Sequence, residues 1–202
     1  MRGRRVILSL RVPAALMILA AALTCNNPFA TREPERPGTG GAAIKPANSP
    51  ENVLYNLEAA FESLSIQDYL DVFTADFALH PDPEDSLAYE QEFASGWGID
   101  RETTFANNFL LRQNFVTVDG SPIEITSSYE FKPGGGYYEY HYQMFVPLAD
   151  VLGEGFETIE VEGYAFLFLR EDGDGNWAVY DWVDHRIAAS SITWSVLRAQ
   201  HI

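Results

Sequence analysis

Residues 137–148 have the sequence YYEYHYQMFVPL, and this stretch decides the fold because its side chains alternate with a period of two. Tyr140 and Met144 fall on one side of an extended chain, whereas Glu139 and His141 fall on the other. Alternation of aromatic and polar residues is typical of a strand whose sheet has one buried face. The stretch therefore predicts an antiparallel sheet.

Two later stretches, 157–170 and 176–185, have the same character and flank the turn sequence EDGDGN, which predicts a β-hairpin. Trp177 and Val179 are expected to face the core. Trp182 has the opposite parity, so burial of both tryptophans requires a β-bulge between Val179 and Trp182.

Helical periodicity precedes the strands. A first helix is predicted from Pro50, with Ser49 as its N-cap. A short second helix follows over 66–73, and a third is predicted over about 101–113 after Asp100 as its cap. Helices followed by an antiparallel meander predict an α+β fold in which N-terminal helices pack on a curved antiparallel sheet.

The only cysteine, Cys25, directly follows a leader, residues 1–24, that has the features of a signal peptide. Four arginines precede an apolar run of about a dozen residues, which is shorter than the 20 or so residues needed to span a bilayer. Cys25 has no disulfide partner in the chain. The alternative is an unmodified cysteine in a simple signal peptide.

The stretch AALTC, residues 21–25, resembles the lipobox of bacterial lipoproteins, in which the cysteine becomes the lipidated first residue after cleavage. The resemblance implies export and a lipid anchor at Cys25 in the bacterial cell envelope. Asn26 stands where an Asp would signal inner-membrane retention, which favours the outer membrane if the source has one.

The rest of the chain divides into a tether and one domain. Residues 25–48 are rich in Pro, Gly and small polar residues, which predicts a disordered tether, and residues 49–202 have the length of one domain. Within that domain, residues 86–99 have no assignable pattern. The formal net charge of −16 argues against nucleic acid as a partner, which would require a basic surface.

The domain resembles the nuclear transport factor 2-like (ketosteroid isomerase-like, cystatin-like) superfamily, which includes domains of exported lipoproteins of unknown function. The resemblance lies in residues 49–83, 175–185 and 193–199 and extends over most of the domain. It implies two or three N-terminal helices on the concave face of a strongly curved, cone-shaped sheet.

Candidate catalytic residues are few. In the steroid isomerases of this superfamily an Asp before a Pro acts as the base, and Asp82 falls within one residue of that position. Glu58 or Ala59 stands in place of the tyrosine that donates to the oxyanion. The alternative for Asp82 is a carboxylate in a Pro-rich turn. Glu139 and His141 share one side of a strand and could form a base with its orienting acid, or a solvated strand face.

A metal or cofactor is not expected. Asp172, Asp174 and Asn176 have the spacing that begins an EF-hand loop, but Trp177 and Val183 occupy the positions that require Gly and Glu. The turn is therefore assigned to the hairpin.

Two classes of function follow. The first is a non-catalytic envelope lipoprotein whose cone binds a small apolar ligand or an envelope protein, with a homodimer as a further possibility. The second is a cone-pocket lyase, isomerase or hydrolase that uses Asp82 or the Glu139 and His141 pair. The residues expected to line the cone are Tyr55, Phe61, Tyr69, Phe105, Phe109, Tyr140 and Trp182.

The leader predicts that Cys25 is lipidated, because it ends an apolar segment and has no other thiol to pair with. Mass spectrometry of the mature N-terminus is expected to show a diacylated or triacylated cysteine, and Cys25→Ser should release the protein from the membrane fraction. An uncleaved, unmodified Cys25 would refute this prediction.

Overall fold

The structure, a computed structural model, describes residues 43–116, 123–149 and 156–202. The leader, Cys25 and residues 26–42 lie outside the described residues, so the predicted signal peptide, lipidation and tether stay predictions. The described helices and strands, in chain order, are α2 (Pro50–Glu62), α3 (Ile66–Leu70), β1 (Phe73–His80), α4 (Pro83–Ala88), α5 (Glu90–Phe93), β2 (Trp97–Gly98), α6 (Ile99–Val116), β3 (Glu124–Lys132), β4 (Tyr137–Ala149), β5 (Phe156–Glu171), β6 (Trp177–His185) and α7 (Trp194–Ala199).

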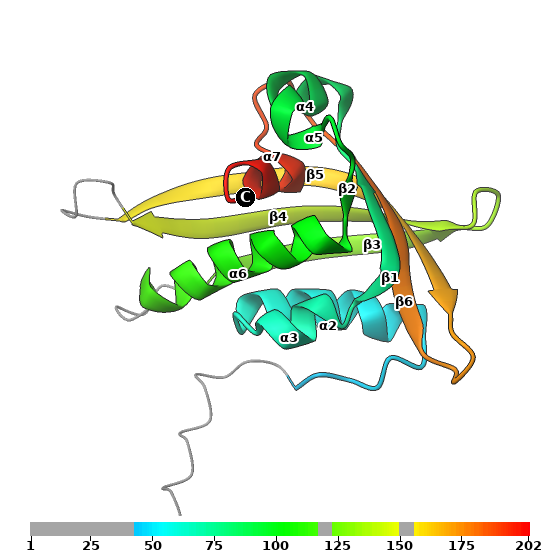
Figure 1. Ribbon diagram of the computed structural model, residues 1–202. Helices are drawn as coiled ribbons and strands as arrows, with labels where there is room; N and C mark the ends of the chain where they lie inside the picture. The colour runs from blue at the N-terminus through cyan, green and yellow to red at the C-terminus, as the bar shows by residue number, and fades with distance from the viewer. Residues whose placement is uncertain (1–42, 117–122, 150–155) are drawn as a thin grey trace, which may run out of the picture. The chain divides into compact units, whose positions relative to one another are not determined.

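A six-stranded sheet with the order β2-β1-β6-β5-β4-β3 organises the domain, and it is strongly curved (Figure 1). Helices α2, α3, α6 and α7 lie on its concave side (Figure 1). The predicted α+β class is confirmed. One detail differs, because β1 and β6 pair in parallel while the other neighbouring strands are antiparallel.

The first helix begins as predicted. The Ser49 side chain accepts a hydrogen bond from the Asn52 backbone N–H at 3.3 Å, and Pro50 opens the helix. Leu54, Leu57 and the other apolar positions of one face are buried. The third predicted helix, α6, is longer than expected, since it begins at Ile99 directly after β2 and includes Asp100 within its first turn.

The stretch that the sequence left unassigned forms α4, α5 and the short strand β2. The Asp82 carboxylate caps α4 by accepting the Glu84 backbone N–H at 2.9 Å. Leu87 is exposed, whereas Phe93 and Trp97 are buried. These elements are too short to show hydrophobic periodicity, so the sequence could not predict them.

The predicted bulge in β6 is confirmed. Phe168 of β5 lies opposite Asp181, and Leu169 lies opposite Val179, so Tyr180 is the extra residue. The bulge turns Trp182 inward, where it is fully buried beside the equally buried Val179.

The N-terminal part of the described chain is attached to the domain before the predicted boundary at Ser49. The buried Asn56 side chain exchanges two hydrogen bonds of 2.8 Å with the Lys45 backbone, and the Trp177 backbone N–H donates to the Ala47 carbonyl at 2.6 Å. Residues 45–47 therefore form a strap along α2 and the start of β6.

Gly163 in β5 is fixed by close packing. A Cβ at this position would lie 2.3 Å from the Tyr142 hydroxyl oxygen and 2.8 Å from the His185 carbonyl oxygen. The neighbouring Tyr142 stands opposite Gly163 in the sheet. Its ring therefore occupies the volume that a side chain would need.

Gly163→Ala is expected to lower the free energy of unfolding by about 1–3 kcal/mol, because a buried methyl group would be forced against Tyr142 and His185. Chemical denaturation measures this change. Gly134→Ala is the matched control, since a Cβ there has no atom within 4 Å. Equal midpoints for the two variants would contradict the packing described.

Candidate functional site

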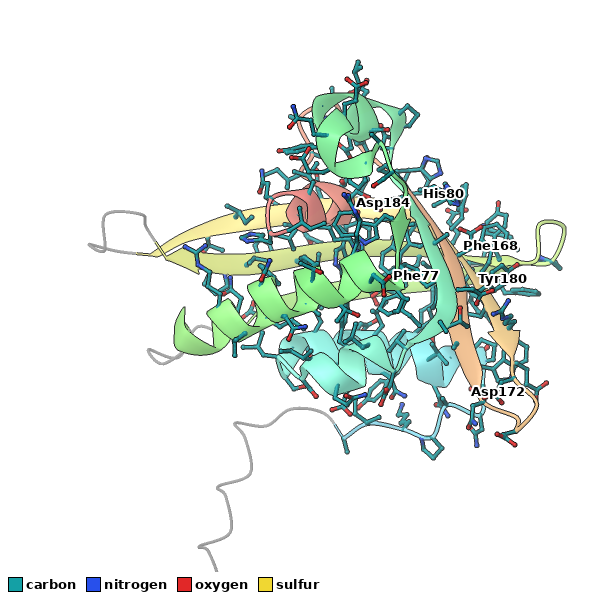
Figure 2. All side chains as sticks on the ribbon, viewed as in Figure 1. Phe77, His80, Phe168, Asp172, Tyr180 and Asp184 are labelled. Carbon is teal, nitrogen blue, oxygen red and sulfur yellow. The ribbon has the colours of Figure 1, made fainter. Side chains whose placement is uncertain are left out.

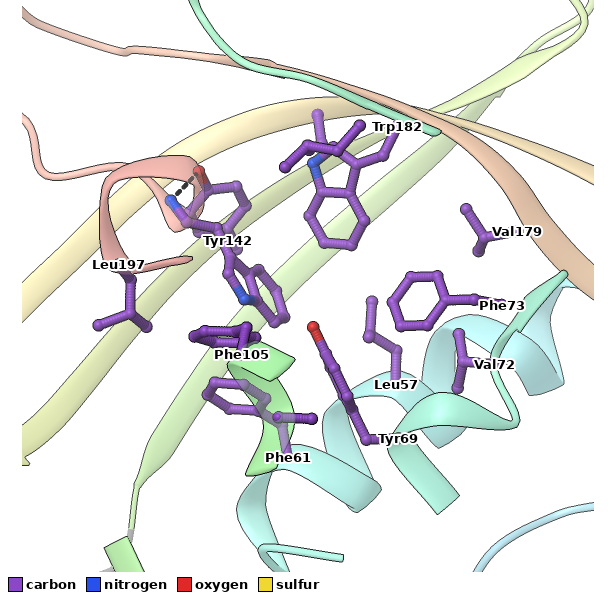
Figure 3. Packing of buried hydrophobic residues seen from close by; sticks show 14 of the residues in the cluster. Leu57, Phe61, Tyr69, Val72, Phe73, Phe105, Tyr142, Val179, Trp182 and Leu197 are labelled. Carbon is purple, nitrogen blue, oxygen red and sulfur yellow. Dashed lines mark hydrogen bonds between the residues drawn. The ribbon is translucent and has the colours of Figure 1, made fainter. Parts of the chain in front are cut away.

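The short helix α7 fills the concave side of the sheet. All six of its residues are buried, and it contacts β5 and α6. The Trp194 ring centre lies 5.0 Å from that of Phe61, 5.4 Å from that of Tyr142 and 4.9 Å from that of Trp182. Figure 3 shows these side chains packed against one another. The helix is thus part of the core.

A buried ion pair holds α7 to α6. The Arg198 Nε donates to both carboxylate oxygens of Glu102 at 3.0 and 2.9 Å, and neither side chain is exposed to solvent. The Tyr69 hydroxyl also donates to Glu102, and the Trp97 indole nitrogen donates to it at 2.7 Å. The Glu102 carboxylate therefore joins α3, β2, α6 and α7.

The charge on Arg198 is stabilised by its surroundings. Burial alone would lower the pKa of Arg198, but the negative charge of Glu102 and other neighbours outweighs burial and raises it. The guanidinium carbon also lies 4.4 Å from the ring centre of Trp182 and 5.3 Å from that of Trp194. Burial strongly raises the pKa of the Tyr69 hydroxyl, which keeps it a neutral donor.

A second buried carboxylate, Asp184, fixes the beginning of α7. Asp184 accepts hydrogen bonds from the Tyr142 hydroxyl at 2.8 Å and from the Ser195 backbone N–H and hydroxyl at 2.8 and 2.6 Å. Burial raises the pKa of Asp184, although these hydrogen bonds oppose the shift. The Tyr142 hydroxyl in turn accepts the Trp194 backbone N–H at 2.9 Å (Figure 3). Asp184 thus binds donors in the first turn of α7.

A third buried carboxylate, Asp85, connects α4 to the segment after β6. It accepts hydrogen bonds from the Arg186 Nε at 2.8 Å and from the Thr193 hydroxyl at 2.6 Å. Thr193 is itself the N-cap of α7. Asp85 thereby binds both ends of the segment between β6 and α7, at Arg186 and at Thr193.

The residues predicted to line the cone differ in their burial. Tyr55 is half-buried away from the cone, and the Lys45 ammonium nitrogen lies 3.5 Å from its ring centre. The others are fully buried and make core contacts rather than lining an open cavity; they are Phe61, Tyr69, Phe105, Phe109, Tyr140 and Trp182.

The catalytic candidate Asp82 lies at a helix terminus. Besides capping α4, its carboxylate accepts the Arg186 backbone N–H at 3.2 Å. Both oxygens therefore bind backbone donors, as expected for the Pro-rich turn that was the alternative.

Glu139 and His141 lie on the other side of the sheet from the helices, not at the mouth of the cone. The Glu139 carboxylate lies 2.9 Å from the His141 ring nitrogen and 3.5 Å from the Lys132 ammonium nitrogen. The hydrogen bond to His141 and the charge of Lys132 lower the pKa of Glu139. A carboxylate with a lowered pKa is a weaker base, and the exposed pair matches the solvated-face interpretation.

Aromatic rings cover the face of the sheet that no described helix covers. We call this surface the aromatic face; its residues are Tyr137, His141, Tyr164, Phe166, Phe168, Tyr180 and His185. Ring centres are 4.5 Å apart for Tyr137 and Phe166 and 4.9 Å apart for Tyr164 and His185. Figure 2 shows Phe168 and Tyr180 on this face, pointing away from the helices. Most of these rings are half-buried.

Two surface cavities lie outside the filled cone. One, of about 320 Å³, borders the aromatic face at His141 and is also lined by Gln143, Glu162 and Ile187. The other, of about 200 Å³, lies under the strap beside Trp177. The larger cavity is lined by His141, Tyr142 and Glu162, but each of these has another partner: the Tyr142 hydroxyl donates to Asp184, Glu162 accepts the Ser191 hydroxyl, and His141 lies against Glu139.

The described residues contain no cluster of three or more His, Cys, Asp or Glu side chains that could hold a metal ion. In the hairpin once compared with an EF-hand, the Asp172 carboxylate accepts the backbone N–H groups of Asp174 and Asn176 at 2.8 and 2.9 Å. No helix within the described ranges is long and apolar enough to cross a membrane.

No protein-family model and no curated protein sequence matches the chain. Similar solved structures include a ketosteroid isomerase-like protein from Erwinia carotovora atroseptica, 13% identical with a TM-score of 0.40 over 68% of this chain and 93% of that one. A protein of unknown function with a cystatin-like fold from Nostoc punctiforme is 14% identical, with a TM-score of 0.37 over 70% and 90% of the two chains. A conserved protein from Planctomyces limnophilus is 12% identical, with a TM-score of 0.44 over 66% and 89%.

The element order and the helices on the concave face of an unclosed sheet match what the resemblance implied. The fold is α+β, with helices on the concave side of a curved, mostly antiparallel sheet. The likenesses to solved structures concern the fold and carry no ligand or reaction to this chain.

Sequence analysis missed the charged centre of this domain. Glu102 lies three residues before Phe105 and seven before Phe109, so helical spacing puts it on the buried face. Arg198 follows Trp194 by four residues, so helical spacing puts it on the buried face of α7 as well. Opposite charges at core positions of two helices were the available signal.

Arg198→Met and Glu102→Leu are each expected to lower the free energy of unfolding by about 3–5 kcal/mol, because each leaves a buried charge without its partner. The double variant should cost less than the sum of the single variants, as measured in a denaturation cycle. Lys132→Met, at an exposed ion pair, is the control and should leave the midpoint unchanged. Strict additivity would contradict direct coupling.

Proposed function

We propose that this chain is an exported, lipid-anchored, non-catalytic protein that binds an envelope protein through the aromatic face of its sheet. The observation that carries the proposal is that α7 fills the concave side, while the opposite face presents the aromatic rings. The binding surface is thereby assigned to the outside of the cone.

The filled interior argues against the cone as the binding site. The side chains expected to line a pocket contact one another, as Phe61 does with Phe109 at 5.6 Å between ring centres. The two interior carboxylates are engaged with protein donors, since Glu102 receives four donor contacts and Asp184 three. The indole nitrogens of Trp182 and Trp194 and the Arg198 Nη1 are buried without a hydrogen-bond partner. A small apolar ligand would have to displace α7 and break these contacts.

The same geometry argues against the enzyme alternative. Asp82 is a helix cap, and the Glu139 and His141 pair lies on the exposed side of the sheet. A general base needs a substrate held within hydrogen-bond distance and shielded from water. Asp82 lines neither of the two cavities described, and the cavity at His141 is open at the surface of the sheet.

The aromatic face has the composition of a protein-binding surface. Tyr and Phe are enriched at the centres of protein interfaces because they bury much area with few rotatable bonds. The strands that carry the rings also carry the acidic residues Glu139, Glu162 and Asp181. The basic neighbours are Arg170, beside Tyr180, and Lys132, 3.5 Å from Glu139. A partner with an apolar centre and a basic rim fits this arrangement.

The predicted anchor supports a role at the envelope. A tether from Cys25 to the strap at Lys45 would let the domain move some 25 Å from a membrane surface, taking about 5–6 Å times the square root of 20 residues. Lipidation and export remain part of the proposal, to be tested at Cys25 as described above.

A photoreactive phenylalanine analogue placed at Phe166 or Phe168 of the full chain is expected to form a covalent adduct with a partner protein in intact cells. The same analogue at Leu87, a site 78% exposed, is the control and should give none. Small-ligand binding in the cone would give no protein adduct. Adducts equal in amount at Leu87 and Phe166 would refute the aromatic face as the binding surface.

A further inference from the structure

The edge strand β3 offers an interaction surface separate from the aromatic face. Its sequence is EITSSYEFK, residues 124–132, and it pairs on one side with β4 without irregularity. In the part of the chain that the structure describes, its other side pairs with no strand. Such an edge carries unpaired backbone donors and acceptors.

The backbone groups that face outward are identified by one contact. The Ile125 backbone N–H donates to the Glu62 carboxylate of α2 at 3.3 Å, so this residue points its backbone away from β4. Because the direction alternates along a regular strand, Ser127, Tyr129 and Phe131 also face outward. Tyr129 and Phe131 are 43% and 49% exposed, which is high for aromatic side chains.

The strand is complementary to itself. If two copies of β3 pair antiparallel about Ser128, Glu124 of one copy lies opposite Lys132 of the other. In the same register Ile125 lies opposite Phe131, and outward-facing residues meet only outward-facing residues. The outward backbone groups of Ser127, Tyr129 and Phe131 then pair in antiparallel geometry, and the Ile125 N–H exchanges its Glu62 acceptor for the Phe131 carbonyl of the second copy.

Charge selects this register over its neighbours. Moving the centre by one residue to Ser127 keeps the backbone parity but places Glu124 opposite Glu130 of the other copy, on both sides of the two-fold axis. Like charges directly opposite each other destabilise a strand pair. Moving the centre to Tyr129 leaves Glu124 opposite Gly134, beyond the end of β3.

We propose that two copies of this chain associate through antiparallel pairing of their β3 strands, centred on Ser128. The two six-stranded sheets become continuous, and Tyr129 and Phe131 are covered by the second copy. The contact is isologous, as expected for a two-fold dimer. It leaves the aromatic face of each copy open.

Cysteine cross-linking of the full chain tests the register. Ser128 faces Ser128 of the second copy in a non-hydrogen-bonded pair, where Cα atoms lie about 4.5 Å apart and a disulfide fits. Ser128→Cys should give a disulfide-linked dimer in oxidised intact cells. Thr126→Cys, whose two copies lie about 14 Å apart along the strand, should not. Both variants contain Cys25, so any disulfide formed through Cys25 contributes equally to the two samples.

A charge introduced into the edge tests the contact itself. Adding Phe131→Lys to Ser128→Cys should reduce the linked dimer about tenfold, because the pairs with Ile125 are lost on both sides. Leu111→Lys is the matched control, since Leu111 is also 49% exposed but lies on α6, and it should leave the dimer unchanged. Absence of the Ser128→Cys dimer, or equal dimer from Thr126→Cys, would overturn the proposal. The cross-linking test of the aromatic face at Phe166 is independent of both results, so the two proposals can fail separately.

Discussion

The contact between Arg198 and Glu102 is the interaction on which the rest of the structure depends. Both side chains are fully buried, so neither charge has water to stabilise it. Glu102 must therefore keep Arg198, Tyr69 and Trp97 as donors, and these come from separate elements. The position of α7 follows from this requirement, because Arg198 belongs to that helix.

The closed concave side follows from the position of α7. Trp194 enters the cone with Arg198, and the Asp184 carboxylate fixes the start of the helix. A cone filled in this way is a scaffold for its outer surfaces. The aromatic face and the β3 edge are two surfaces of the described sheet that expose aromatic rings or strand backbone, and they are different parts of that sheet.

The sequence predicts the regular elements well, because their periods are long enough to detect. The alternation from Tyr138 to Val146, the Ser49 cap and the bulge before Trp182 each follow from local geometry. The bulge was predictable because Val179 and Trp182 have opposite parity and cannot both be buried on a regular strand. Trp177, also expected to be buried, packs against the core but is only partly buried.

The candidate site was much less predictable. The sequence identifies the inward aromatic residues but not that α7 occupies the space between them, since filling depends on contacts distant in the chain. Asp82 and Glu139 have residue types suited to catalysis, yet their roles are set by the Glu84 backbone and by Lys132. Residues 86–99 could not be assigned from the sequence because their elements are short and are held by tertiary contacts, such as that of Asp85 with Arg186.

Amide hydrogen exchange in α7 tests the central claim, that this helix is a permanent part of the core. The Ser195 amide donates to Asp184 and the Leu197 amide donates to the Thr193 carbonyl at 3.1 Å. We predict that both amides exchange only through global unfolding, with the same free energy of exchange as the central strand β5. Exchange of Ser195 and Leu197 at a free energy well below that of β5 would show that α7 leaves the cone in the native state, and would contradict the account.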